Sequence, residues 1–554
     1  MSFVLVSGDP ERTVALQDVS DDGRPLARVE VAARDLAAEV VGREAARPRW
    51  VWDDTARWYP SLLAAGVRVE RCQDLRLCHA ILRGSIRCAD SALALAPPGP
   101  WDGPRPGLPR PVEVSLFDDP RVEPVAADDG PDALAELQAQ LAAVDGSLEP
   151  GRLRLLLAAE STGALIAAEM RHDGMPWSVE VHDELLTRAL GERPLGGGRP
   201  SRLEALADEV RGALGQPALN LDSQPDLLRA LRSAGLDVAT TRTWEIRALD
   251  HPVTAPLLAY KKLARLLSAN GWAWMEAWVH DGRFRPDYVP GGVVTGRWAT
   301  SGGGALQLPA SIRGAVRADP GWRLVVADAA QLEPRVLAAM SGDGAMAAAG
   351  RQADLYQGVV DAGIVETRQE AKYAMLGAIY GATTGASAVL MPRLTRAYPR
   401  AVGMVEAAAR AGERGDVVST WLGRSSPVPD EAWQAELRAA SGEGAGAEDV
   451  RAARRRGRDW GRFTRNFIVQ GTAAEWALCW MAALRRRLLA VDGRPHLVFF
   501  LHDEVMVHSP ANVADEVAMA IRDAAAEAGR LLFGDSPVDF ALDVSVVDSY
   551  DQAK

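Results

Sequence analysis

The chain has 554 residues, 48% of them apolar, and a formal net charge of −12 at pH 7, a size that suits several domains with ordinary apolar cores. It has no run of about 18 uncharged apolar residues and no basic N-terminal stretch followed by an apolar one, so we expect a soluble cytoplasmic protein with no membrane partner. The negative charge excludes a uniformly basic chain, but local contacts depend on where the cations lie.

Residues 1–96 alternate short apolar runs with helical patterns. We predict strands at Phe3 to Val6 and Trp50 to Trp52, and helices at Val31 to Ala45 and Tyr59 to Ala65. This alternation indicates an α/β unit with a mixed sheet. The cysteines do not have the spacing of a zinc finger or ribbon, so we expect buried reduced thiols at Cys72, Cys78, Cys88 and Cys479.

Residues 97–131 have the composition of a linker. Seven prolines lie between Pro97 and Pro111, with three glycines among them, and Asp128-Asp129-Gly130 ends the segment. Proline and glycine at this density favour extended backbone with little packing.

Residues 132–290 are predicted to be mostly helical. Apolar residues recur at helical spacing from Leu134 to Val144, and a further helix is expected from Leu153 to Met170. Lys261 and Lys262 fall within this region that is predicted to be mostly helical. Two such cations would bind phosphates without reading base sequence, although a solvated bundle helix carries the same residues.

A short valine-rich run predicts a buried strand, Leu324 to Ala327, that ends on Asp328 before a helix beginning near Pro334. A carboxylate at the end of a strand is presented to a cleft. A lone Asp there is more often a helix cap or turn former, so its meaning depends on the rest of the chain.

A helix predicted from Thr367 to Tyr380 carries four residues at intervals of four: Arg368, Lys372, Leu376 and Tyr380. Each step rotates about 40° beyond a full turn, so the four share one broad face. Two cations followed by an apolar and an aromatic side chain suit a triphosphate at one end and a base at the other.

The segment from Arg451 to Arg465 is strongly basic, with a single acidic residue, Asp459, and seven arginines: Arg451, Arg454, Arg455, Arg456, Arg458, Arg462 and Arg465. A solvated helix face would explain them, and so would a track for a phosphate backbone, which would make binding salt-dependent.

Asp503 is expected at the tip of a hairpin with arms Leu497 to Leu501 and Val505 to His508. Two Asp residues on neighbouring strands would hold a pair of divalent cations about 3.5–4 Å apart, as in enzymes of phosphoryl transfer. Without cations, two carboxylates at this distance would shift each other's pKa.

These motifs, in this order, resemble those of DNA polymerase family A, the bacterial DNA polymerase I group. The resemblance covers about residues 155–554 and consists of Asp328 to Arg335 (motif A), Arg368 to Gly381 (motif B), His502-Asp503-Glu504 (motif C), Thr295-Gly296-Arg297, Arg462 to Thr472, and the terminal Tyr550 to Lys554. One such motif is weakly specific, whereas several in order are strongly so.

The resemblance implies an α+β multidomain fold, in which a ribonuclease H-like α/β exonuclease-type domain precedes a right-hand polymerase with an antiparallel palm sheet and helical thumb and fingers. The expected boundaries are 1–96 for the exonuclease-like domain, 97–131 for the linker and end of that domain, 132–290 for a helical connection and the thumb, 291–343 for the first part of the palm, 344–459 for the fingers, and 460–554 for the second part of the palm. The 5′-nuclease module of full-length family members is expected to be absent.

The family's 3′→5′ exonuclease needs a carboxylate cluster to hold two metals. Here the first strands carry no Asp-x-Glu, Trp58 stands at the helix position, and Asp132 matches the last Asp while Asp128 replaces the Tyr of that motif. We therefore predict a degenerate exonuclease-like domain that keeps the fold and has lost the chemistry.

The implied activity is template-directed addition of dNTPs to a primer 3′-hydroxyl with two Mg²⁺ ions, for which Mn²⁺ can substitute, in DNA repair or replication. The expected partners are primer-template DNA and dNTPs, and the protein is expected to be a nucleoid-associated monomer. The implied metal ligands are Asp328 and Asp503, with Glu504 and Lys372 as further catalytic residues. The implied dNTP contacts are Gln331, Glu333, Tyr356, Arg368, Lys372, Leu376 and Tyr380. The implied DNA contacts are Lys261, Lys262, Arg297, Arg462, Asn466, Gln470 and His502.

Some positions depart from the family pattern. Leu376 stands where most members have Phe or Tyr beside the incoming sugar, and Tyr356 stands in place of a His near the triphosphate. Glu333, which in this family blocks a 2′-hydroxyl, favours DNA over RNA synthesis. Three alternatives stay open: a catalytically weak DNA-binding scaffold, a polymerase that retains 3′→5′ exonuclease activity, and a nuclease using the same Asp pair, which would not need Arg368 and Lys372.

Overall fold

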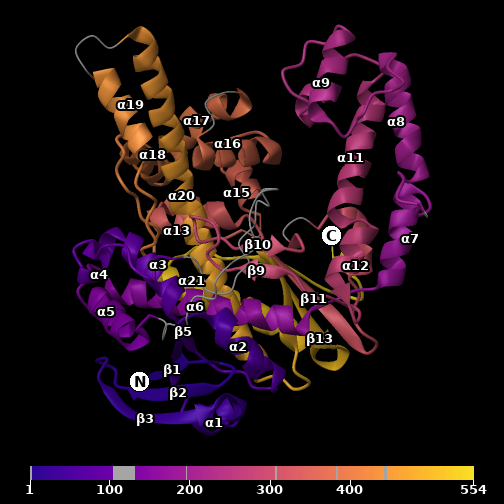
Figure 1. The fold of residues 1–554 in the computed structure, drawn as a ribbon. Coiled ribbons are helices and arrows are strands. Elements are labelled where there is room, and N and C mark those ends of the chain that lie inside the picture. Colours follow the sequence, from indigo (N-terminus) through magenta and orange to yellow (C-terminus); the bar gives the residue numbers. More distant parts are fainter. Residues whose placement is uncertain are drawn as a thin grey trace, which may run out of the picture.

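The structure is a computed structural model that describes residues 3–103, 131–194, 196–305, 308–352, 354–381, 385–441 and 446–553. Figure 1 shows an N-terminal sheet at the bottom of the molecule, a second sheet beside it, and two helical lobes that rise on either side of the second sheet. The lobe on the right contains α7 to α12, and the lobe on the left contains α13 to α20.

The N-terminal unit is built on a five-stranded mixed sheet in the order β3-β2-β1-β4-β5. β1 pairs antiparallel with β2 and parallel with β4, and β4 pairs parallel with β5. Its core contains fully buried tryptophans at positions 50, 52 and 58. The elements are β1 (Phe3–Gly8), β2 (Thr13–Val19), β3 (Pro25–Ala32), α1 (Leu36–Glu44), β4 (Arg49–Trp52), α2 (Thr55–Ala64), β5 (Cys72–Asp74), α3 (Leu75–Gly84) and α4 (Ala92–Leu95).

The sequence predicts β1, β4 and α2 but misses β2 and β3, and the helix expected from Val31 is wrong at its start. Val31 belongs to β3, and α1 begins only at Leu36. β3 is the edge of the sheet and is exposed along most of its length, so it lacks the apolar alternation that identifies a half-buried strand.

The expected linker lies mostly outside the described residues, as does Asp128. Its beginning packs against α3: the Arg76 guanidinium lies 5.4 Å from the Trp101 ring centre, and the Asp102 carboxylate lies 2.6 Å from Arg83 Nε. The four cysteines are buried and form no disulfide.

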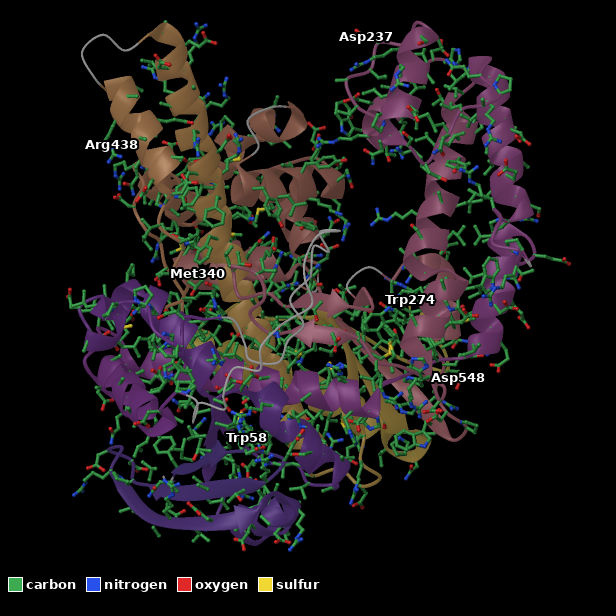
Figure 2. All side chains as sticks on the ribbon, in the orientation of Figure 1. Trp58, Asp237, Trp274, Met340, Arg438 and Asp548 are labelled. Atoms are coloured by element: carbon green, nitrogen blue, oxygen red, sulfur yellow. The ribbon has the colours of Figure 1, made fainter. Side chains whose placement is uncertain are left out.

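The right-hand lobe and the connection to it are helical, as predicted. Asp132 caps α5 by accepting hydrogen bonds from the Leu134 and Ala135 amides. The lobe has a core of its own, and Figure 2 shows Asp237 at its tip and Trp274 near its base. The helices are α5 (Ala133–Asp145), α6 (Pro150–Asp173), α7 (Val179–Leu190), α8 (Ser201–Leu214), α9 (Gln224–Ser233), α10 (Thr243–Arg247), α11 (Thr254–Asn270) and α12 (Trp272–Trp278).

The second sheet is fully antiparallel, in the order β12-β13-β11-β14. α20 and α21 pack on it, and its buried valines belong to a core that continues into the left-hand lobe. Its strands are β11 (Trp322–Ala329), β12 (His496–Leu501), β13 (Glu504–Pro510) and β14 (Leu542–Val547). Two small sheets accompany it, formed by β6 (Met175–Pro176), β7 (Val279–His280), β8 (Arg283–Phe284), β9 (Asp287–Val289) and β10 (Ala299–Gly302).

The left-hand lobe ends in a helix of 42 residues, α20. The expected boundary between residues 459 and 460 falls inside this continuous helix. Among the described residues α20 is also the one helix long and apolar enough to cross a membrane, but 89% of its apolar window is buried within the protein, as in a core helix. The remaining helices are α13 (Leu332–Ser341), α14 (Gly344–Ala349), α15 (Leu355–Asp361), α16 (Arg368–Tyr380), α17 (Gly385–Ala397), α18 (Pro399–Glu413), α19 (Glu431–Ser441), α20 (Ala447–Leu488) and α21 (Ala514–Phe533).

A buried ion pair fastens the N-terminal unit to the rest. Arg485 of α20 lies 2.7 Å from Glu169 of α6 and donates to the carbonyl oxygens of Val69 and Glu70. The Tyr59 hydroxyl donates to the same Glu169 carboxylate at 2.5 Å. Three segments far apart in sequence therefore meet at one guanidinium.

Candidate active site

Asp328 lies near the end of β11, as predicted, although the strand continues through Ala329. In the antiparallel register it stands directly opposite Glu504 of β13 on one side and Asp543 of β14 on the other. Directly paired residues of antiparallel strands project to the same face, so one face of the sheet carries three acidic side chains in a row. Asp543 was not predicted, because its sequence neighbours form an ordinary strand pattern.

Asp503 lies in the hairpin turn between β12 and β13, which confirms the predicted hairpin. His502 adopts a left-handed conformation with φ of 58°, and the Asp503 amide donates to the Leu501 carbonyl at 2.7 Å. The Ala329 amide donates to the Asp503 carbonyl at 2.8 Å, which holds the turn against the end of β11. The backbones that carry Asp328 and Asp503 are therefore adjacent.

Carboxylate oxygens are the donors that hard divalent cations such as Mg²⁺ prefer, so the Asp328 and Asp503 pair fits such ions chemically. Among the described residues there is no group of three or more His, Cys, Asp or Glu side chains placed to hold a metal.

Glu504 differs from its two neighbours, because only 2% of it is exposed. Burial and the nearby Glu504 carboxylate raise the pKa of the Tyr550 hydroxyl well above its usual range. The Arg313 guanidinium lies 4.5 Å from the Tyr550 ring centre. The structure thus places Glu504 in the protein interior, toward the C-terminal segment.

The turn after β11 is held by two side chains. Gln331 adopts φ of 55° at the start of α13; its amide nitrogen donates to Asp354, and its oxygen accepts from the Leu355 amide. The Arg335 guanidinium is 1% exposed and donates to the carbonyl oxygens of residues 330, 350, 352 and 539. Arg335 therefore fixes the backbone around Asp328 and is not offered to a ligand.

Glu333 connects three elements. It forms an ion pair with Arg297 and accepts a hydrogen bond from the Tyr380 hydroxyl at 2.5 Å. Partial burial and this bond raise the pKa of Tyr380 to about 12, against the opposing effect of a hydrogen bond with Gln470. Four of the predicted residues are thus brought together next to the turn that follows β11.

The predicted helix from Thr367 is confirmed as α16, with Thr367 and Glu370 forming a capping box. The face with four-residue spacing is partly open: the Arg368 side chain is 52% exposed, Lys372 is exposed, Leu376 is half-buried and Tyr380 is 39% exposed. This face is therefore accessible to a ligand.

Arg368 is held by a residue that the sequence analysis did not select. Its Nε lies 2.5 Å from the Asp354 carboxylate, and its guanidinium lies 5.6 Å from the ring centre of Tyr356, which is buried. Burial would raise the pKa of Asp354, but the bond from Arg368 and two backbone amides lower it. Burial raises the pKa of Tyr356 to about 12. Asp354 is the N-cap of α15, and this position was the signal by which the sequence could have identified it.

The predicted DNA contacts are spread over both lobes. On α11, Lys262 is exposed, whereas Lys261 donates to the Thr241 carbonyl at 2.6 Å and its pKa is lowered by burial. On α20, Arg462 pairs with Asp459, and Asn466 is half-buried.

The continuous arginine track expected from residue 451 to 465 is interrupted. Arg456 pairs with Glu436 of α19, and the buried Arg465 pairs with Glu406 of α18. The arginines left exposed within residues 451–465 are Arg451, Arg454, Arg455, Arg458 and Arg462. Two of the seven positions therefore support the lobe itself.

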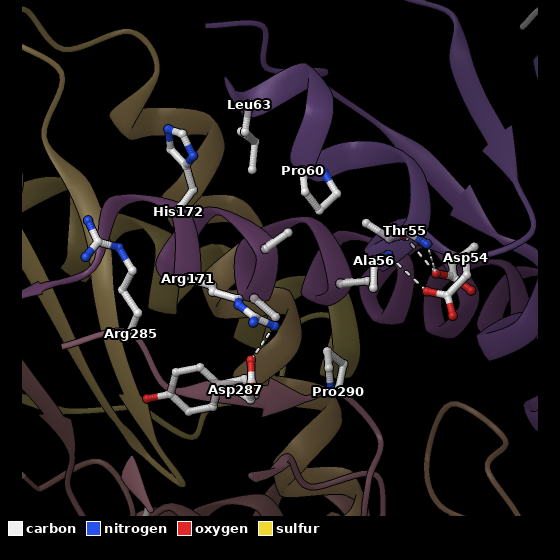
Figure 3. A pocket seen from close by; sticks show the side chains of 15 residues that line it. Asp54, Thr55, Ala56, Pro60, Leu63, Arg171, His172, Arg285, Asp287 and Pro290 are labelled. Atoms are coloured by element: carbon white, nitrogen blue, oxygen red, sulfur yellow. Dashed lines mark hydrogen bonds and ion pairs between the residues drawn. The ribbon is translucent and has the colours of Figure 1, made fainter. Parts of the chain in front are cut away.

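A cavity of about 570 Å³ lies elsewhere, between α2, α6 and β9. Figure 3 shows Arg171 directed at Asp287 within it, with Asp54 and Thr55 at the other end. None of the predicted site residues lines it. The acidic residues at the Asp54 end are occupied as helix caps: Asp54 accepts from the Ala56 amide, and Asp74 accepts from the Thr55 and Leu77 amides.

The sequence model of DNA polymerase family A matches residues 200–552, a range that contains every motif of the site. The chain belongs to DNA polymerase family A. The relatives of this family A chain include DNA polymerase I of Chloroflexus aurantiacus, 27% identical over 376 residues that make up 63% of this chain and 37% of that protein. The thermostable DNA polymerase I of Thermus filiformis is 26% identical over 384 residues, or 62% of this chain and 43% of that protein.

The family A chain thus spans about two fifths of the length of these relatives. It is also similar to the solved polymerase domain of Pol1 from M. smegmatis, a complex with DNA primer-template and dNTP. The TM-score is 0.66 at 18% identity, and the match covers 100% of this chain and 96% of that one. This likeness shows a shared fold, that of a family A polymerase domain.

Proposed function

We propose that this chain is a template-directed DNA polymerase that adds dNTPs to a primer 3′-hydroxyl. One observation carries the proposal: the amide of Ala329, the residue after Asp328, donates a hydrogen bond to the Asp503 carbonyl at the end of an antiparallel sheet. Glu333, in the helix that follows Asp328, is bonded to Tyr380 on the cationic helix α16. Paired carboxylates beside a cationic, partly exposed helix suit a triphosphate that reacts at its α-phosphorus.

Asp328 and Asp503 would hold two divalent cations, Mg²⁺ by preference with Mn²⁺ as a substitute. Bound there, such ions supply the charge that lowers the pKa of the primer hydroxyl and stabilises the leaving pyrophosphate. Asp328 and Asp503 would hold these ions, and the buried Glu504 would support this end of the sheet beside Tyr550.

The chain's own cations act on the triphosphate. Arg368 offers a planar fork and Lys372 a point charge, and both neutralise charge that develops as pyrophosphate leaves. In the structure Asp354 holds Arg368 at the rim of α16, so Arg368 exchanges one anionic partner for another when a nucleotide binds. Gln331 and Tyr356 fix the surroundings of Asp354.

Sugar selection falls to the residues around Glu333. Arg297 and Tyr380 bind its carboxylate from two sides, so a 2′-hydroxyl entering there would meet a rigid, already satisfied group. Leu376, one turn before Tyr380, packs against the sugar without the aromatic face that most family members have.

The exposed Lys262 and Arg462, together with Asn466, Gln470, His502 and Arg297, are proposed to contact the primer-template backbone, and Lys261 acts indirectly through Thr241. The partners are primer-template DNA and dNTPs, and the protein works as a cytoplasmic, nucleoid-associated monomer in DNA repair or replication.

The N-terminal unit is proposed to be a ribonuclease H-like, exonuclease-type domain without 3′→5′ exonuclease activity. Its first strand, β1, carries no carboxylate, Trp58 is buried with its indole donating to Asp53, and Asp54 and Asp74 serve as helix caps. A carboxylate occupied in this way is not available to hold a catalytic metal.

Extension of a labelled primer on a DNA template with Mg²⁺ tests both proposals, with dNTPs, rNTPs and no nucleotide in parallel. We expect extension with dNTPs, little with rNTPs, and no shortening without nucleotide. Duplex binding without extension would favour the scaffold alternative. Shortening that persists in Asp503→Asn would favour a retained exonuclease.

A further inference from the structure

The loop 418–426 lies between the N-terminal unit and the site, and it is closed by its own hydrogen bonds. The Thr420 amide donates to the Arg424 carbonyl at 2.8 Å, and the Ser426 amide donates to the Val418 carbonyl at 2.9 Å. Glu475, buried in α20, binds the loop through the Thr420 hydroxyl and the Leu422 amide. The loop is therefore a compact unit, held by its own hydrogen bonds and by Glu475.

The N-terminal unit holds one side of this loop. The Ser85 hydroxyl donates to the Gly423 carbonyl at 2.7 Å, and the Ile86 amide donates to the Ser425 hydroxyl at 3.0 Å. Arg87 donates to three loop carbonyls, the shortest contact being 3.0 Å to residue 421, while Glu149 lies 2.6 Å from its guanidinium. Ser85 is 2% exposed and the Arg87 side chain is 10% exposed, so the contacts of these two residues are buried or partly buried.

The other side of the loop supports the segment before β11. Arg424 is bound by Glu160 of α6 at 2.8 Å, and Glu160 is 1% exposed. A Cβ atom placed on Gly296, which has φ of 83°, would lie 2.5 Å from Arg424 Nε, so this backbone rests directly on the guanidinium. One on Gly471 would lie 2.3 Å from the Thr420 side chain and 3.2 Å from the Thr295 carbonyl.

The residue after Gly296 is Arg297, whose guanidinium forms the ion pair with Glu333, and Glu333 binds Tyr380. Unbroken contacts thus run from Ser85 and Arg87 through the loop and Arg424 to Arg297. From there they continue to Glu333 and Tyr380, which lie where the sugar of the nucleotide is proposed to bind. Such a path transmits position only if each contact is tight, and each of these is a hydrogen bond, an ion pair or a close packing contact.

We propose that the N-terminal unit positions the nucleotide site. Ser85 and Arg87 fix the position of loop 418–426, and the loop fixes the positions of Gly296 and Arg297. Arg297 in turn orients Glu333 and, through it, Tyr380. The proposed effect on the nucleotide rests on the proposed polymerase function, whereas the chain of contacts does not depend on it. This positioning gives the N-terminal unit a function that needs no exonuclease chemistry. Ser85, Arg87 and Arg424 are positioning residues and touch no substrate.

Steady-state primer extension with Arg87→Ala tests the role. We expect KM for dNTP to rise about 3- to 10-fold and discrimination against rNTP to fall, with kcat within about twofold, because loss of one to three hydrogen bonds displaces the sugar contacts and leaves Asp328 and Asp503 in place. Arg43→Ala is the matched control, since Arg43 pairs with Asp18 inside the N-terminal unit. Ser85→Ala repeats the test if Arg87→Ala does not fold.

Amide hydrogen exchange of the same full-length variants tests the geometry without activity. We expect faster exchange at residues 418–426 and also at Gly296, whose amide donates to the Val293 carbonyl, in Arg87→Ala but not in Arg43→Ala. Faster exchange in the loop with none at Gly296, or an unchanged KM in a folded variant, would overturn the proposal. If the unaltered protein extends no primer, the proposed function fails while the exchange result still decides the geometry.

Discussion

The molecule contains two regions of helices and sheet, and both sheets have acidic residues near strand ends. The surroundings of these acidic residues differ between the two sheets. In the N-terminal unit Asp54 and Asp74 accept hydrogen bonds from backbone amides at the starts of α2 and α3. In the second sheet Asp328 stands in strand register with Glu504 and Asp543, next to the turn that carries Asp503. An acidic residue that caps a helix stabilises the fold, whereas the proposed function gives Asp328 and Asp503 a role in metal binding.

Asp503→Asn is the sharpest way to test this contrast. We expect primer extension to fall by at least about 10³-fold, because the lost carboxylate charge is worth several kcal/mol in the transition state. Affinity for primer-template, measured by fluorescence anisotropy, should change little. Asp54→Asn makes the same chemical change in the N-terminal unit and should leave extension intact; equal losses in both variants would remove the contrast.

Arg485→Ala tests how firmly the two regions are joined. Removing the guanidinium leaves the buried Glu169 carboxylate without its main partner, which costs about 3–5 kcal/mol of unfolding free energy. Urea denaturation followed by tryptophan fluorescence measures it. Arg486→Ala removes a neighbouring exposed arginine paired with Glu527 and should cost less than about 1 kcal/mol. Similar costs for the two would mean that the buried junction adds no special stability.

Glu475, which binds loop 418–426, predicts that the stability of the protein depends on pH. Burial raises its pKa to about 7 from the usual 4.5, although the bonds from Thr420 and Leu422 oppose this. The protonated form is therefore favoured in the folded state, so its contribution to stability is full below pH 4.5 and is lost as the pH rises toward 7. The Tm of the protein minus that of Glu475→Gln should fall between pH 5 and pH 7.5. A difference independent of pH would contradict the raised pKa.

Asp74→Ala measures how much an acidic helix cap of the N-terminal unit contributes to the free energy of unfolding. It removes acceptors for the Thr55 and Leu77 amides, so we expect a loss of about 1–2 kcal/mol in unfolding free energy with unchanged dNTP kinetics. Asp90→Ala, on the surface of the same unit, should stay within about 0.5 kcal/mol. A large loss of kcat in Asp74→Ala would show that the N-terminal acids take part in catalysis.

Leu376→Phe carries the smallest expected effect. Restoring an aromatic face beside the sugar should raise kcat/KM for dNTPs about 2- to 10-fold, the value of one aromatic contact. Leu376→Met changes the side chain without adding a ring and should give no gain. Equal gains in both would point to side-chain flexibility in place of aromatic packing.

The sequence by itself determined the local elements that carry the site. The valine-rich run predicted β11, and the period of four after a Thr-x-x-Glu start predicted α16. The apolar arms around Asp503 predicted the hairpin. Each of these elements depends on residues close together in the chain. It failed at β2, and also at β3, whose exposed edge position leaves little apolar pattern.

Tertiary structure alone decided which residues meet. The pairing of Asp328 with Asp543, the hold of Asp354 on Arg368, and the joint binding of Glu169 by Tyr59 and Arg485 each unite residues from separate elements. Periodicity cannot reveal such contacts, since they depend on strand order and on how helices pack. Tertiary packing also decided that Lys261 donates to the Thr241 carbonyl and that Arg456 and Arg465 pair with Glu436 and Glu406 of neighbouring helices.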